Sequence, residues 1–149
     1  MRRASVADAF QVARLLHDFN TEFSEPVPEL GVLTERVAQF IERDEAVFLL
    51  AGGGPDGFAE IRFRPSLITG ALDAYLEELY VAPAKRGQGL GRALLEAAME
   101  TSRRQGAARI DVGTSEDDTA ARALYESAGF TNREGRPDGP VMLFYERDL

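Results

Sequence analysis

The sequence predicts a mixed α/β (α+β) fold: one mixed central β-sheet with flanking helices, in a single domain over residues 1–149. The chain has 149 residues, 44% of them hydrophobic and 28% charged, which suits one globular domain with its own core. Apolar runs and alternations of strand type follow two segments with helical spacing in the first half of the chain. From Ala71 to Phe130 the order strand, helix, strand, helix is typical of proteins in which a helical connection joins two parallel strands.

The first forty residues predict a short edge strand and two helices. The strand is Met1–Ala4, and Ser5 followed by Asp8 is typical of a helix start, with apolar residues at helical spacing behind it: Val12, Leu15, Leu16 and Phe19. The segment Asn20–Gly31 contains two prolines and three glutamates and predicts an exposed loop. Thr34 is the expected cap of the second helix, whose inner face is Val37, Phe40 and Ile41.

Two strands joined by a glycine-rich turn follow these helices. The continuous apolar run Ala46–Ala51 is typical of a strand covered on both faces. Residues 52–57 form the turn. The next strand is half-buried, because apolar side chains alternate with charged ones that should face outward, namely Glu60, Arg62 and Arg64.

A third strand, Ala71–Val81, changes the phase of its alternation. Apolar side chains fall on even positions up to Leu76, Glu78 interrupts them, and they resume on odd positions at Leu79. A change of phase within one strand predicts one extra residue, a β-bulge, near Glu78 and Leu79. A strand end that is covered on both faces would give the same pattern, so parity leaves both open.

The remaining elements complete the α/β pattern. In order they are a helix over Gly89–Arg104, a strand around Ile110 and Val112, a helix capped by Thr114 or Ser115 and running to Ala128 before Gly129, and a final strand, Val141–Arg147.

Composition excludes several kinds of chemistry. With no cysteine and one histidine, His17, the chain has no thiol nucleophile, disulfide or cysteine-type metal site, and we expect no metal. The net charge of −8 disfavours nucleic acid as a partner and favours a cationic substrate. No apolar run approaches the ~20 residues of a membrane span, and the basic first residues are not followed by an apolar stretch of signal-peptide type. We therefore expect a cytoplasmic location without membrane attachment.

A glycine-rich loop separates the third strand from the following helix and predicts an anion site. Glycines allow a ligand to approach the backbone closely, and the helix N-terminus carries about half a positive charge. A phosphate or pyrophosphate is the ligand such a loop suits. The alternative is a tight turn with no ligand. The loop reads Arg86, Gly87, Gln88, Gly89, Leu90, Gly91.

These residues resemble a known enzyme family. Arg86-x-x-Gly89-x-Gly91, after a strand that ends Leu79–Pro83, is similar to the acetyl-CoA signature of the GNAT superfamily of N-acetyltransferases. Leu124–Phe130 resembles that family's second signature and follows at the expected distance. The stretch from Asp117 to Tyr125 is similar to one found in some aminoglycoside acetyltransferases, so the chain resembles the small-amine and aminoglycoside type within the family.

The resemblance implies a fold with a splayed parallel strand pair and acetyl-CoA as cofactor. The backbones of Leu79 and Val81 would contact the thioester and pantetheine, and the amides from Gly87 to Arg92 the pyrophosphate, with Arg86 and Arg92 neutralising phosphate charge. In many members an asparagine side chain also contacts the cofactor, and this chain has Asp118 at that position. A carboxylate there lacks the amide donor and adds negative charge.

The same resemblance implies direct attack of a primary amine on the thioester. Glu77 or Glu78 would be the general base, with Glu77 at the family's usual position, and Tyr125 would protonate the leaving thiolate. Each of these has a structural alternative: a surface carboxylate for the glutamates and an aromatic core residue for Tyr125. The expected function is acetyl-CoA-dependent N-acetylation of a small, cationic amine.

The acceptor site is expected where the first two helices connect. Carboxylates around an aromatic ring would bind a cationic amine, and the candidates are Asn20, Glu22, Phe23 and Glu25. A solvated acidic loop is the alternative. Other readings of the whole chain are a non-catalytic acyl-CoA sensor and a protein N-terminal or lysine acetyltransferase, and a homodimer through the C-terminal strand stays open.

Overall fold

A computed structural model describes all residues, 1–149, which divide into two compact units, Met1–Val112 and Gly113–Leu149. The first holds one mixed sheet and three α-helices, and the second holds one short α-helix. None of the helices is both long and apolar enough to cross a membrane.

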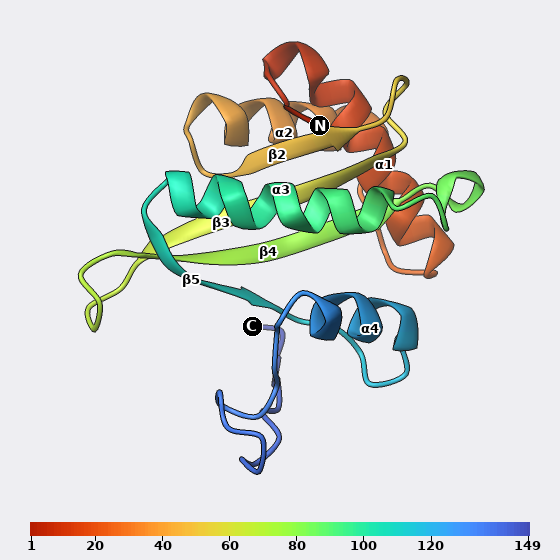
Figure 1. Cartoon of the computed structure of the whole chain (residues 1–149). Coiled ribbons are helices and arrows are strands. Elements are labelled where there is room, and N and C mark those ends of the chain that lie inside the picture. The colour runs from red at the N-terminus through yellow and green to blue at the C-terminus, as the bar shows by residue number, and fades with distance from the viewer. The chain divides into compact units, whose positions relative to one another are not determined.

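The sheet of the first unit has five strands in the order β1-β2-β3-β4-β5 (Figure 1). Neighbouring strands are antiparallel except β4 and β5, which are parallel, as the strand–helix–strand order predicts. The strands are β1 Arg2–Arg3, β2 Val47–Ala51, β3 Gly57–Pro65, β4 Leu72–Val81 and β5 Ala107–Val112.

Helices cover both faces of this sheet. Figure 1 shows α3 (Leu90–Arg104) in front of the strands, with α1 (Ala9–Glu22) and α2 (Leu30–Glu42) behind them. Short 3-10 turns, η1 Val6–Asp8 and η2 Pro83–Lys85, precede α1 and α3. The core behind the sheet joins apolar residues of α1 and α2 to the inward side chains of the strands, including Val12, Leu33, Phe48, Phe58 and Tyr80. Since both faces are covered, β2 is buried throughout, as its apolar run predicts.

The predicted bulge in β4 is present, one residue earlier than the parity pattern suggested. Glu60 of β3 pairs with Glu78, and the next residue, Ile61, pairs with Leu76, so Glu77 is the extra residue. Past the bulge the side chains change face. Leu76, before it, is buried outside the core of α1 and α2, whereas Tyr80, after it, belongs to that core.

The parallel pair of strands separates after the bulge. β5 pairs with β4 from Leu72 to Leu76 and ends at Val112, while β4 continues to Val81. The edge of β4 from Glu77 to Val81 therefore has no β5 partner for its backbone groups. This is the splayed pair that the family resemblance implies.

The first helix starts as the sequence indicates, but the second starts earlier. The carboxylate of Asp8 accepts from the backbone N–H of Ser5 at 2.8 Å, as in a capping box. The predicted Thr34 cap is wrong, because α2 begins at Leu30 and the Thr34 hydroxyl donates to the Leu30 carbonyl at 2.7 Å within the helix. A threonine can bond back along a helix as well as cap it, so composition alone misplaced this boundary. The exposed loop shrinks to residues 23–29.

The second unit departs twice from the predicted elements. Its helix, α4 (Thr119–Ser127), is capped by Asp118, whose carboxylate accepts a hydrogen bond from the Ala121 N–H at 3.0 Å. The predicted cap, Thr114 or Ser115, is therefore wrong. The final strand predicted over Val141–Arg147 does not form. Alternating apolar residues describe a strand only where another strand supplies ladder hydrogen bonds, and this segment pairs with none.

Candidate active site

The glycine-rich loop enters α3 in a conformation that requires glycine. Gly87 and Gly89 have φ of +74° and +81°, and Gly89 is the N-terminal cap of the helix. A Cβ at either position would meet no atom within 4 Å, so the loop faces open space and backbone geometry alone demands glycine. The first N–H groups of α3 have no partner within the helix, as at every helix start. An exposed nest of amides with a helix dipole behind it fits a pyrophosphate.

Arg86 ties this loop to two other elements. Its Nε donates to the Val81 carbonyl at 2.9 Å, and its two terminal nitrogens donate to the Glu22 carboxylate at 2.7 and 2.8 Å. Its guanidinium also lies 5.7 Å from the centre of the Tyr80 ring. The structure thus joins Arg86, which was predicted to bind phosphate, to Glu22, which was predicted to bind the acceptor and lies 64 residues away in the chain. The other basic candidate, Arg92, lies exposed in the first turn of α3.

The end of α1 packs onto β4 through aromatic rings. Tyr80 is 5% exposed and stacks on Phe19 with ring centres 5.1 Å apart, and Phe23 meets Phe19 edge-on at 5.3 Å. Burial, with the nearby Glu22 carboxylate, raises the pKa of the Tyr80 hydroxyl. The hydrogen bonds from Arg86 hold the pKa of Glu22 below its usual value.

The four predicted acceptor residues do not form one group around a ring. Asn20 donates its side-chain amide to the Leu16 carbonyl at 2.8 Å, and Glu22 binds Arg86. Phe23 is 55% exposed, and Glu25 is exposed in the following loop. Only Glu22 is thereby brought to the glycine-rich loop.

Two carboxylates lie opposite each other at the bulge. Glu78 of β4 pairs across the ladder with Glu60 of β3, which is 7% exposed, while Glu77 is exposed on the bulge itself. Burial, together with the negative charge of Glu77, raises the pKa of Glu78 to about 7. Burial, with the charges of Glu77 and Glu78, raises the pKa of Glu60 to about 7 as well, against a smaller opposite effect of Arg62.

Sequence reasoning missed Glu60. The alternation in β3 predicted an exposed carboxylate, and this is wrong, because α1 and α2 cover the face that alternation leaves to solvent. The sequence did hold a signal, the uninterrupted apolar run of the neighbouring strand, because such a run indicates that both faces of the sheet are covered. The residue opposite Glu60 on β2 is Phe48, which lies in an uninterrupted apolar strand.

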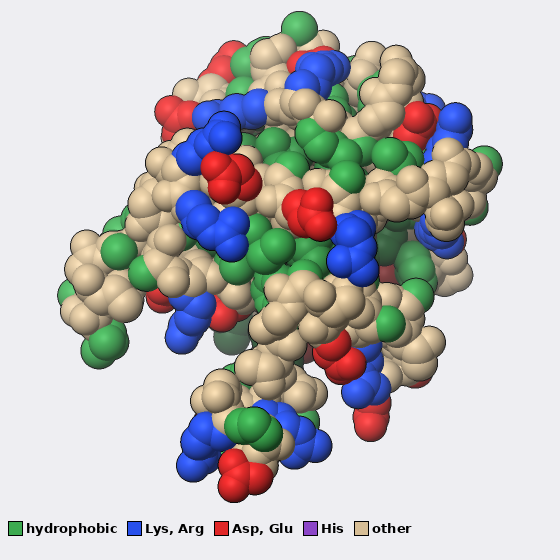
Figure 2. All heavy atoms as spheres, viewed as in Figure 1, with side chains coloured by type: hydrophobic (Ala, Val, Ile, Leu, Met, Phe, Trp, Pro, Cys, Tyr) green, Lys and Arg blue, Asp and Glu red, His purple; other side chains and the backbone are tan.

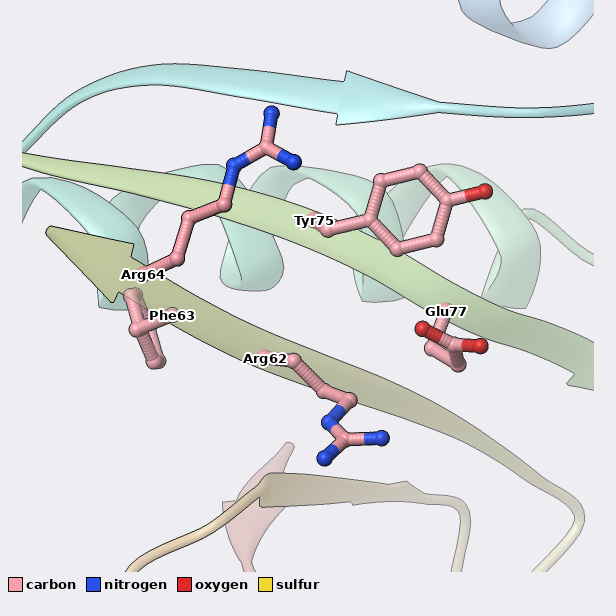
Figure 3. Close-up of a pocket in the computed structure, with 5 residues that line it drawn as sticks. All are labelled: Arg62, Phe63, Arg64, Tyr75 and Glu77. Atoms are coloured by element: carbon pink, nitrogen blue, oxygen red, sulfur yellow. The ribbon is translucent and has the colours of Figure 1, made fainter. Parts of the chain in front are cut away.

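A hollow of about 300 Å³ lies beside Glu77 of the bulge, on the sheet face opposite α3 (Figure 3). Figure 3 shows side chains of β3 and β4 around it, from Arg62, Phe63, Arg64, Tyr75 and Glu77. The Arg62 guanidinium lies 5.1 Å from the centre of the Phe40 ring of α2, so its charge stacks on an aromatic face. On the opposite face, which carries α3, Figure 2 shows acidic and basic side chains interspersed.

The second unit holds the remaining two candidates. Tyr125 lies in α4 with its ring centre 5.8 Å from that of Phe130, so it is part of a small aromatic contact. Asp118 caps the same helix. One carboxylate oxygen of Asp118 is therefore used within the unit.

Comparison with known proteins identifies the class of enzyme. The model of the acetyltransferase (GNAT) family matches residues 12–130. The chain belongs to this family and is an acetyltransferase.

Individual relatives carry acetyltransferase names. Aminoglycoside N(6')-acetyltransferase type 1 of Stenotrophomonas maltophilia is 33% identical over 139 residues, which are 90% of this chain and 87% of that one. Mycothiol acetyltransferase of Beutenbergia cavernae is 42% identical over 62 residues, 40% of this chain and 21% of its own. A crystal structure from Arthrobacter sp. FB24, provisionally named an acetyltransferase, has a TM-score of 0.91 and 44% identity, and the match covers 99% of this chain and 94% of that one.

Proposed function

We propose that the enzyme transfers an acetyl group from acetyl-CoA to a primary amine of a small, cationic acceptor. The observation that carries this proposal is the position of Glu78, a half-buried carboxylate on the sheet face covered by α1 and α2, where β4 loses its neighbour. Burial and the charge of Glu77 raise the pKa of Glu78 to about 7, so this carboxylate can attract an ammonium group and accept its proton near neutral pH. The aminoglycoside acetyltransferase name of the Stenotrophomonas maltophilia relative supports a small amine as acceptor.

Acetyl-CoA fits the residues that would hold it. The amides from Gly87 to Arg92 would bind the pyrophosphate, and the unpaired edge of β4, including Leu79 and Val81, offers backbone groups to a pantetheine chain as a further strand would. Because Arg86 is already bound to Glu22 and to the Val81 carbonyl, we assign phosphate binding to the amides first and to Arg86 and Arg92 second.

The general base is Glu78 in this proposal. An alkylammonium has a pKa of about 10.4, so it reaches the site protonated and must lose one proton before it can attack. Glu78 takes that proton, directly or through water, and passes it to solvent. Glu77, the alternative base, is exposed on the bulge and lines the hollow beside Arg62.

The other steps need one hydrogen-bond donor and one acid. When bound, acetyl-CoA supplies a thioester whose carbonyl carbon forms the new C–N bond while the C–S bond breaks. The N–H of Leu79 would donate to the carbonyl oxygen as it gains negative charge. Tyr125 would give its phenolic proton to the departing sulfur and recover one from solvent. The nitrogen loses its second proton, so one proton is released for each amide formed.

The test is calorimetric titration with acetyl-CoA, followed by assays of thiol release over a panel of amines. We expect binding with turnover, and log kcat/KM for the amine should rise with pH up to about 7 and then level off, because Glu78 must be ionised. Glu78→Gln should lower kcat by about 100-fold or more with acetyl-CoA affinity unchanged. Glu35→Gln, an exposed carboxylate on α2, is the matched control.

Three results would contradict parts of the proposal. Binding of acetyl-CoA without thiol release on any amine would favour a sensor, and no binding at all would remove the cofactor assignment. A Glu78→Gln enzyme with unchanged kcat would transfer the role of base to another residue, with Glu77→Gln as the next variant.

A further inference from the structure

One buried carboxylate has no part in the steps above. Glu60 lies in the middle of β3, with Phe48 of β2 on one side of it and Glu78 of β4 on the other. Residues directly opposite one another on adjacent strands point to the same sheet face, and Phe48 belongs to the core formed by α1 and α2. Glu60 and Glu78 therefore lie side by side under that layer of helices, and only 7% of Glu60 is exposed.

No cationic side chain forms a salt bridge with either carboxylate. Neither carboxylate accepts a hydrogen bond in the structure, and neither is among the fully buried polar groups that lack a partner, so their oxygens keep some contact with solvent. The charged groups that act on Glu60 are Glu77, Glu78 and Arg62, and the Arg62 guanidinium stacks on Phe40 instead of bonding to either carboxylate. Burying a carboxylate without a partner is costly, and placing a second one opposite it adds like-charge repulsion. A carboxylate retained for stability would have a donor beside it.

We propose that Glu60 is a second carboxylate of the acceptor site. With Glu78, it binds the ammonium group of the acceptor on the sheet face where β3 and β4 pair. This proposal rests on the proposed function, because it assigns the acceptor of that same reaction. An ammonium group has three N–H donors, so it can bond to both carboxylates at once. Glu78 then takes the proton, and Glu60 keeps its charge beside the nitrogen and holds it in place.

The pair also defines which amines the site accepts. Three acidic side chains converge at the bulge, namely Glu60, Glu77 and Glu78. An acceptor with a carboxylate close to its amino group would bring a fourth negative charge into a partly buried site. The substrate class is therefore a primary ammonium group without a neighbouring carboxylate.

The experiment compares two acceptors of similar length, propylamine and β-alanine, in the full-length enzyme. For the wild type we expect kcat/KM to be at least about tenfold higher with propylamine. Glu60→Gln keeps the size of the side chain and removes the charge. It should raise the KM for propylamine about tenfold or more and reduce the preference over β-alanine, with the Kd for acetyl-CoA unchanged.

Two further variants separate charge from structure. Glu35→Gln should match the wild type in every constant, because this side chain is exposed on α2 and has no part in the proposed site. Glu60→Asp keeps the charge and should retain more of the preference for propylamine than Glu60→Gln does. If Glu60→Gln does not fold, Glu60→Asp and the selectivity of the wild type decide the question.

The outcomes distinguish this proposal from the proposed function. A KM for propylamine that stays within twofold in Glu60→Gln, while thiol is still released, overturns the role of Glu60 and leaves the acetyltransferase mechanism standing. Equal kcat/KM for propylamine and β-alanine in the wild type overturns the selectivity. Absence of thiol release from the wild type with every amine overturns the proposed function itself.

Discussion

Removing the charge of Glu60 should make the protein more stable at neutral pH. Burial and neighbouring carboxylates raise the pKa of Glu60 from its ordinary 4.5 to about 7. Below pH 4.5 the carboxyl is protonated in both the folded and the unfolded state and costs nothing. As the pH rises to 7, the unfolded chain ionises freely while the folded protein must either hold the proton or bury a charge. The free energy of unfolding therefore falls over this interval and is level above it.

The magnitude follows from the size of the change in pKa. At about 1.4 kcal/mol for each pH unit, a rise from 4.5 to about 7 corresponds to about 3 kcal/mol. Domains of this size unfold with about 5–15 kcal/mol, so the loss is a large part of the total. Glu78 titrates in the same interval and is coupled to Glu60. The double variant Glu60→Gln/Glu78→Gln should therefore gain less stability than the two single variants gain together.

Urea unfolding at pH 5 and pH 8 measures this directly. The wild type should lose several kcal/mol between the two pH values, Glu35→Gln should lose the same amount, and Glu60→Gln should lose about 3 kcal/mol less. At pH 8, Glu60→Gln should thus be more stable than the wild type while being the poorer enzyme. A Glu60→Gln protein with the pH dependence of the wild type would refute the reasoning, because Glu60 would then not be an unpaired buried acid.

Three further experiments test other parts of the site. Gly89→Ala places a side chain at φ +81° and should cost about 1–2 kcal/mol of stability and lower acetyl-CoA affinity in calorimetry, whereas Gly31→Ala, at a helical glycine with ordinary φ, should do neither. Tyr125→Phe should lower kcat about 100-fold with little change in the KM for acetyl-CoA; equal kcat would exclude the hydroxyl from the reaction. In a double-mutant cycle with Arg86→Gln, Glu22→Gln should show a coupling of up to about 1 kcal/mol, and none would mean that the pair is not formed in solution.

Local chemistry made much of the fold predictable from the sequence. The glycines at positions 87 and 89 predicted a loop before α3 whose backbone a ligand can approach, and the structure has a loop there in which both residues adopt positive φ. The change of phase in β4 predicted a bulge to within about one residue, because side chains alternate strictly along a strand and an extra residue must interrupt them. These features depend on residues that are neighbours in the chain, so they can be predicted from the sequence alone.

Element boundaries and the C-terminal segment were less predictable. Thr34 and Asp118 are both good capping residues, yet only Asp118 caps a helix, because the hydroxyl of Thr34 bonds back within α2. The apolar alternation of Val141–Arg147 indicated a strand, but a strand also needs a partner with free backbone groups. Several local patterns thus allow two structures, and contacts made elsewhere choose between them.

The sequence by itself determined the individual strands of the sheet, the glycine-rich loop and the family, since each of these rests on residues close together in the chain. Only the tertiary structure decided which carboxylates matter. The same alternation of charged and apolar residues in β3 describes an exposed Glu60 if one sheet face is open and a buried Glu60 if helices cover both. Likewise Glu22 meets Arg86 only when α1 packs onto β4. Burial and pairing between distant segments depend on the register of strands and the packing of layers, and these exist only in the folded chain.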